Sequence, residues 1–199
     1  MAVFSAQYNN QLSYVNSSVL PYASPSSRVG GNGRGQQYNE ETYMRFDPTS
    51  LSGQTVTACS LACVINSVSV PATSYTASIF NQLRKTYIQL SSTVRYDDFP
   101  VLDAWGSGAE GAAIQSATVP SAASGTVTFP TSASFVAMVQ GWVDGSIDWR
   151  RGLILAAGNT GWYGYYHTFS SFTLTVTATA PVTSVVPQIM TNLFRIRAA

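Results

Sequence analysis

The stretch "NTGWYGYYHTFSS", residues 159–171, holds the only histidine of the chain among aromatic and hydroxyl side chains, with no charged residue. A histidine beside a serine and a carboxylate could serve as the base of a nucleophilic triad. The chain contains many serines, but none lies in the Gly-x-Ser-x-Gly turn that presents a nucleophile. A packed or surface imidazole therefore explains His167 better, and the sequence predicts no catalytic residue and no enzyme.

Two pairs of carboxylates could serve a glycosidase or a calcium site. Asp97 and Asp98 are adjacent, so on a strand their side chains would point to opposite faces. Asp144 and Asp148 flank the end of an expected helix, where Asp commonly stabilises turns. Structural roles are favoured, and the sequence predicts no cofactor and no metal, with a structural Ca²⁺ in the loop at 97–110 as the open alternative.

The two cysteines, Cys59 and Cys63, lie in "ACSLACVINSV". On a strand they would share a face but lie about 13 Å apart, beyond the ~7 Å that a disulfide allows. A single such pair with one distant histidine is weak support for a metal site. We expect buried free thiols.

Aromatic side chains are the stronger candidates for binding, because such rings stack on sugars and anchor protein interfaces. By alternation Tyr163, Tyr165 and His167 share one face of a strand, while Trp162 and Tyr166 share the other. One set should be core, and the other is a candidate contact surface. The predicted ligand or partner contacts are Trp105, Trp149, Trp162, Tyr163, Tyr165 and His167.

The composition of the 199-residue chain is poor in charge: 45% of residues are hydrophobic and 10% are charged, against about a quarter in ordinary proteins. The formal net charge of +1 offers no field for nucleic acid or an anionic membrane. No apolar stretch reaches the roughly 18 residues of a membrane span. We therefore expect no nucleic acid and no membrane among the partners.

Strand patterns recur along the chain. The run at 55–70 is rich in small and β-branched residues and is expected to be buried on both faces. Glycines at 30–35, "GGNGRG", lack the Lys-Ser/Thr end of a phosphate-binding loop, so a flexible loop is expected at about 20–37. Strands are expected at 41–48, 55–70, 74–83, 85–96, 125–130, 151–158, 161–169 and 172–180.

One helix is expected at about 134–144, because Phe135, Met138, Val139 and Trp142 follow helical spacing. Thr131, Ser132 or Ser134 could cap its start and Gly145 its end, over about two turns. Eight or nine strands with this helix predict an all-β fold, an antiparallel jelly-roll β-sandwich. A single domain would cover 1–180, and 181–199 would form a C-terminal extension or assembly arm.

The segment "ETYMRFDPTSLSGQTVTACSLACVI", residues 41–65, resembles the DNRLRE-type β-sandwich modules, which are related to carbohydrate-binding modules. The second half resembles the family's Val-x-x-Trp helix and Asn-Gly-Leu-x-Leu strand, although Trp149-Arg150-Arg151 replaces the usual Asn. The resemblance covers roughly residues 10–178 and implies a β-sandwich that could bind a glycan. The matching residues are Arg45, Phe46, Asp47, Ser50, Leu51, Gly53, Trp142, Gly152, Leu153 and Leu155.

Two functions are compatible with these patterns. The first is a structural protein of a bacteriophage virion, either a capsid decoration (cement) protein or a tail or fibre component. Uncharged Thr, Val and Tyr faces suit permanent interfaces, and "MAVFSAQYNNQLSYV" lacks the basic start and apolar run of a signal peptide. Such a protein would be made in the host cytoplasm, form a homo-oligomer and contact a major capsid protein. The alternative is a stand-alone carbohydrate-binding module that recognises a polysaccharide through its tryptophans.

Overall fold

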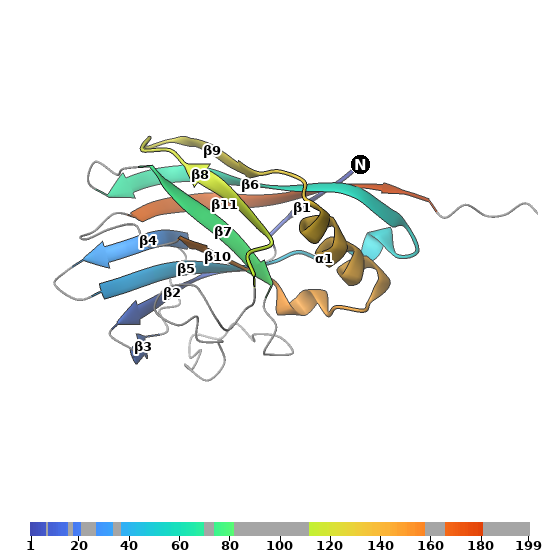
Figure 1. The fold of residues 1–199 in the computed structure, drawn as a ribbon, viewed down its shortest axis with the longest axis horizontal. Coiled ribbons are helices and arrows are strands. Elements are labelled where there is room, and N and C mark those ends of the chain that lie inside the picture. The colour runs from blue at the N-terminus through green and yellow to red at the C-terminus, as the bar shows by residue number, and fades with distance from the viewer. Residues whose placement is uncertain are drawn as a thin grey trace, which may run out of the picture.

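Two long β-strands form the middle of the fold in a computed structural model of the chain (Figure 1). β6 (Thr55–Ser69) and β11 (Tyr166–Thr179) pair antiparallel along nearly their whole length. The structure describes residues 1–6, 8–15, 18–20, 27–33, 37–69, 74–81, 112–157 and 166–180. Over these residues the predicted all-β sandwich with one α-helix is confirmed.

The strands form two antiparallel sheets that share one continuous path of hydrogen bonds. The first sheet, which we call the β6–β11 sheet, adds β9 (Gly125–Phe129) beside β6. β1 (Ala2–Ser5) and β4 (Ser27–Gly33) pair with successive parts of β11. The second sheet contains β8 (Gln115–Val119), β7 (Tyr75–Asn81), β10 (Leu153–Ala157), β5 (Gln37–Arg45), β2 (Tyr8–Val15) and β3 (Ser18–Leu20). The two sheets are joined where β4 pairs with β5.

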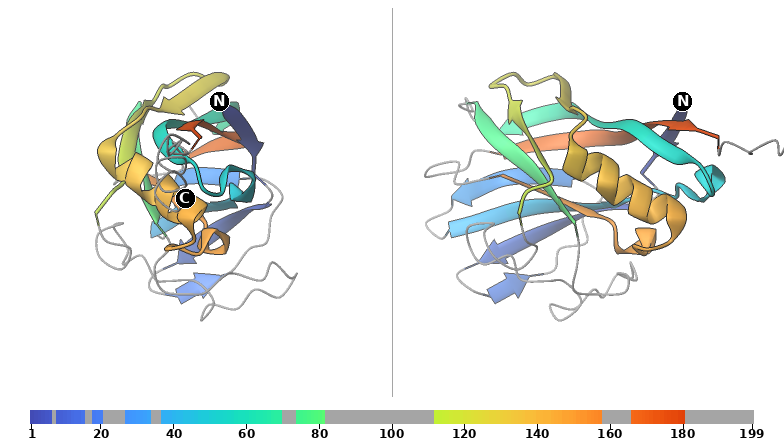
Figure 2. Two further views of the ribbon diagram at one scale, coloured as in Figure 1. Left: turned by 90° about the vertical axis from the view of Figure 1, so that its right-hand side faces the viewer. Right: turned by 45° about the vertical axis from the view of Figure 1, so that its right-hand side comes forward.

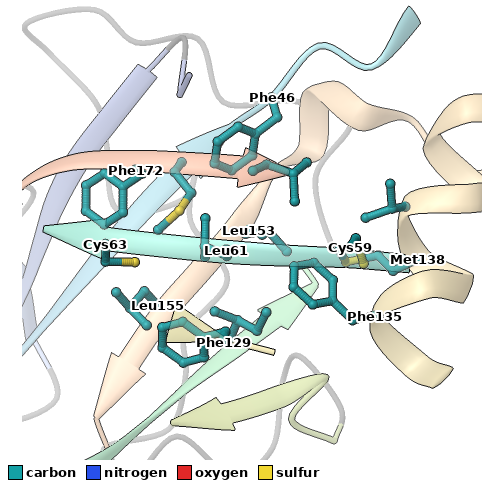
Figure 3. Packing of buried hydrophobic residues seen from close by; sticks show 14 of the residues in the cluster. Phe46, Cys59, Leu61, Cys63, Phe129, Phe135, Met138, Leu153, Leu155 and Phe172 are labelled. Atoms are coloured by element: carbon teal, nitrogen blue, oxygen red, sulfur yellow. The ribbon is translucent and has the colours of Figure 1, made fainter. Parts of the chain in front are cut away.

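The core lies between the two sheets, and β6 contributes one face to it (Figure 3). Cys59, Leu61 and Cys63 are buried. Ser60, which lies between the first two, and Val64, which follows Cys63, face outward. The expectation of burial on both faces of 55–70 is therefore wrong. Small residues made this run look uniformly apolar, but a second layer covers only one side of the strand.

The helix α1 (Ala133–Asp144) begins and ends close to the predicted positions. The Ser132 hydroxyl accepts a hydrogen bond from the Phe135 N–H at 3.1 Å, and Gly145 adopts a left-handed φ of 78°. With 12 residues, α1 has about three turns rather than two. It lies at one end of the sandwich, next to the start of β6 (Figure 2), where Gln140 Oε1 accepts from the Val56 N–H at 2.7 Å.

The expected loop at about 20–37 is wrong over residues 27–33 and 37, which belong to β4 and β5. Glycine is a poor strand former on its own. Here Gly30 lies between Tyr166 of β11 and Glu40 of β5, so backbone pairing from both sides holds the segment extended.

The expected strands at 161–169 and 172–180 meet in one strand, β11, over the part that is described. Its register shifts around Phe169 and Ser171, which marks a bulge. The N-terminal strands β1, β2 and β3, and β8, were not expected from the sequence. The predicted strand at 85–96 and the predicted extension at 181–199 lie outside the described residues.

Candidate functional site

The outward face of the β6–β11 sheet is the candidate functional site, and its residues are aligned by strand register. Val3, Thr175 and Ser60 form one row across β1, β11 and β6. The next row extends to β9, and each outward residue alternates with one that is buried or half-buried. We name this surface the threonine face; it comprises Met1, Val3, Ser5, Ala58, Ser60, Ala62, Val64, Thr126, Thr128, Ser171, Thr173, Thr175 and Thr177.

No side chain of the threonine face is charged. Among the described residues, the large hydrophobic side chains that are exposed are Met1 at 87%, Val3 at 59% and Val64 at 37%, and all belong to this face. Neighbouring strands lie about 4.8 Å apart and outward residues of one strand about 6.8 Å apart. Methyl groups and hydroxyls in such rows can bind a surface, but they supply no acid, base or activated nucleophile.

His167 lies on β11 with its side chain inside the sandwich, completely buried. Its Nδ1 is 3.2 Å from the Tyr75 hydroxyl and its Nε2 is 3.2 Å from the Ala122 carbonyl oxygen. The Tyr75 hydroxyl also donates to the Val29 carbonyl at 3.0 Å. The expectation that His167 belongs to a contact surface is therefore wrong in this structure: its face of the strand packs inward and ties together β11, β7, β4 and the turn between β8 and β9.

Burial lowers the pKa of His167, against the opposing effect of hydrogen bonds to the backbone at Ala122 and Pro120. The neutral imidazole is thus favoured, with Nε2–H donating to the Ala122 carbonyl. Burial also raises the pKa of Tyr75 above its ordinary value. Because Tyr75 has one hydroxyl hydrogen, the Val29 carbonyl and Nδ1 of neutral His167 share a single donor. None of these partners is the carboxylate that a triad requires.

We expect His167→Gln to lower the free energy of unfolding at pH 8 by about 1–3 kcal/mol, because the buried Tyr75 hydroxyl and the Ala122 carbonyl lose their hydrogen bonds to the imidazole. The pKa of His167 is lower in the folded chain than in the unfolded chain. As the pH falls, the unfolded chain therefore takes up a proton on His167 before the folded chain does. The His167 contribution is complete above the unfolded pKa of about 6.5 and is lost as the pH falls toward the folded pKa.

The difference between wild type and His167→Gln should therefore shrink between pH 8 and pH 5. Urea unfolding followed by tryptophan fluorescence at both pH values measures it. If the difference in unfolding free energy between wild type and His167→Gln stays constant with pH, the assignment of a neutral His167 in the folded chain is contradicted.

The aromatic residues predicted as contacts do not form one described surface. Trp149 lies on the 3-10 helix η3 (Trp149–Arg151) and is half-buried, packed against the hydrophobic core. Part of its ring is therefore covered by the core, and its predicted role as a contact stays a prediction. Trp105, Trp162, Tyr163 and Tyr165 lie outside the described residues, so their predicted roles stay predictions.

The carboxylates near the helix end stabilise turns, as the sequence predicts. Asp144 Oδ1 accepts from the Ser146 N–H at 2.9 Å. Asp148 caps η3, accepting from the Arg150 N–H at 3.1 Å and from its guanidinium at 2.8 Å. The Arg150 side chain is the main cause that lowers the pKa of Asp148. The loop at 97–110, where a Ca²⁺ stayed open, lies outside the described residues.

The cysteines are buried free thiols, as predicted. Burial raises the pKa of Cys59 to about 12 and that of Cys63 well above its ordinary value. Both are therefore protonated at neutral pH, in a state that is a poor nucleophile and a poor metal ligand.

The fold and the site define a β-sandwich with an outer sheet surface, the threonine face, that has no charged side chain. A comparison with models of protein families found no match, and neither did a comparison with curated protein sequences. The likeness to DNRLRE-type modules therefore stays a prediction that rests on its motifs. In the described part of the chain, none of the helices is long and apolar enough to cross a membrane.

Proposed function

We propose that this chain is a non-enzymatic structural protein of a bacteriophage virion, a capsid decoration (cement) protein or a tail or fibre component. The threonine face is the observation that carries the proposal. Soluble proteins usually place charged side chains on exposed sheet surfaces, which opposes association. Permanent interfaces instead have few charges at their centre. A sheet surface without charged side chains, on which Met1, Val3 and Val64 are exposed, suits assembly into a larger particle.

The strand pairing supports the same proposal. β4 pairs with β11, β5 with β10, β6 with β9 and β7 with β8, so the pairs are nested along the chain. We infer from this nesting a jelly-roll arrangement, which recurs in viral capsid proteins and lectins. Charged residues also make up only 10% of the chain, as expected of a protein with much of its surface in contacts.

The proposal is tested by producing the full chain together with the major capsid and tail proteins of the phage whose genome encodes it. Particles are separated on a density gradient and treated with a cross-linker. We expect the chain to sediment with capsids or tails. Particles that form normally while the chain stays at the top of the gradient, at every ratio tested, would contradict the proposal.

The alternative, a carbohydrate-binding module, is supported by the sandwich fold together with the motif resemblance. Both functions can be separated with cellulose, chitin and xylan as insoluble probes. A virion protein without glycan recognition should stay in the supernatant. Retention that is lost in Trp105→Ala or Trp162→Ala, but kept in the core-packed Trp149→Phe, would favour the module.

A further inference from the structure

We infer that the threonine face is the interface between two copies of this chain, related by a two-fold axis. The inference rests on the proposed function, since it takes the face as an assembly surface and names its occupant. It goes beyond that function because it assigns the face to a second copy rather than to a different virion protein.

The chemistry of the face favours a second copy because the face is complementary to itself. In a two-fold interface the same surface lies on both sides, so a patch of one charge would meet its like. Different partners are commonly selected by opposite charges, and the threonine face has no charged side chain with which to select them. Each Thr and Ser hydroxyl both donates and accepts, so any hydroxyl that meets another can form a hydrogen bond.

The shape of the face also fits a sheet packed against its copy. Its central row runs through Ser5, Thr173, Ala62 and Thr128, which are paired in register across four strands. All four side chains are small, so two such sheets could approach at about 10 Å, the usual separation of packed sheets. Val64 lies on β6, which is paired on both sides, so it projects from an inner strand of the face, in the last row along that strand.

The extent of the face matches the centre of an ordinary dimer interface. The face is three strand spacings wide, about 14 Å, and three two-residue repeats long, about 20 Å, measured between Cα atoms. A stable interface covers about 800 Å² on each partner, with an apolar centre and a polar rim. Uncharged outward residues continue beyond the face, and they can provide such a rim: Thr57, Asn66, Thr168, Ser170 and Thr179.

The test is the oligomeric state of the full chain, measured by sedimentation equilibrium. The wild type is compared with one variant that has a lysine on the threonine face and one that has a lysine on the other sheet. We expect the wild type to be a dimer. Thr173→Lys should weaken association at least about 100-fold, because the two-fold axis brings buried like charges together. Thr76→Lys is the matched control: Thr76 is exposed on β7 of the other sheet, on a strand that is also paired on both sides. It should remain a dimer.

Circular dichroism verifies that each variant is folded, and Ser60→Lys, in the neighbouring row, repeats the test if Thr173→Lys does not fold. Mixing Thr173→Lys with Thr173→Glu should restore a dimer, which misfolded chains could not form. A monomeric wild type at about 100 µM, or a dimer that persists in folded Thr173→Lys (or in Ser60→Lys where that replaces it), would overturn the inference. If that monomer still sediments with virion proteins, the proposed function stands without the inference. If neither association occurs, both fail.

Discussion

Gly152→Ala is expected to lower the free energy of unfolding by about 3 kcal/mol, because it combines backbone strain with overpacking. Gly152 has φ 72° and ψ −166°, a region that is open essentially to glycine alone. A Cβ at this position would collide with the Met44 carbonyl oxygen and lie 2.7 Å from Cε2 of Tyr43. The Tyr43 ring cannot simply move away, since its hydroxyl donates to the Arg150 carbonyl at 3.0 Å.

Gly145→Ala is the matched control. Gly145 also has a positive φ, 78°, but nothing lies within 4 Å of its added Cβ. The control should therefore show the conformational cost alone, about 1 kcal/mol. Urea unfolding of both variants measures the difference. Equal losses in the two variants would show that the contact with Tyr43 and Met44 does not constrain this position.

Gly152 also illustrates what the sequence can and cannot reveal. A motif match singles out the residue, but the reason for glycine there is a contact with Tyr43 and Met44, which are more than 100 positions away in the chain. Local patterns of burial were easier to predict. The spacing of Phe135, Met138 and Trp142 defines the buried side of α1 because the helical period is visible within one turn.

The candidate site was harder to predict, because alternation shows which residues share a face but not which face points inward. Both faces of the strand at 161–169 contain large rings, so the burial of His167 follows only from the position of Tyr75 on β7. The threonine face had a signal, the alternating Thr173, Thr175 and Thr177. Its extent depends on which strands flank β11, and nothing local to β11 encodes the pairing with β1.

The largest effect within the helix is expected at Trp142, which is almost fully buried at the end of the sandwich. Trp142→Ala should lower the free energy of unfolding by about 3–5 kcal/mol through lost burial and a cavity. Trp142→Phe should cost much less than a simple loss of volume predicts. Among the described residues the buried Nε1–H of Trp142 finds no hydrogen-bond acceptor, and removing an unsatisfied donor relieves a penalty of about 1–3 kcal/mol.

Phe135→Leu separates these two effects, because it also shortens a buried aromatic side chain of α1 but removes no polar atom. Urea unfolding followed by circular dichroism compares the three variants without relying on tryptophan emission. Trp142→Phe should then be no more destabilised than Phe135→Leu, although it loses a larger ring. A loss in Trp142→Phe close to that of Trp142→Ala would mean that the indole N–H is satisfied in solution. In that case α1 is held against the sandwich by a hydrogen bond as well as by packing.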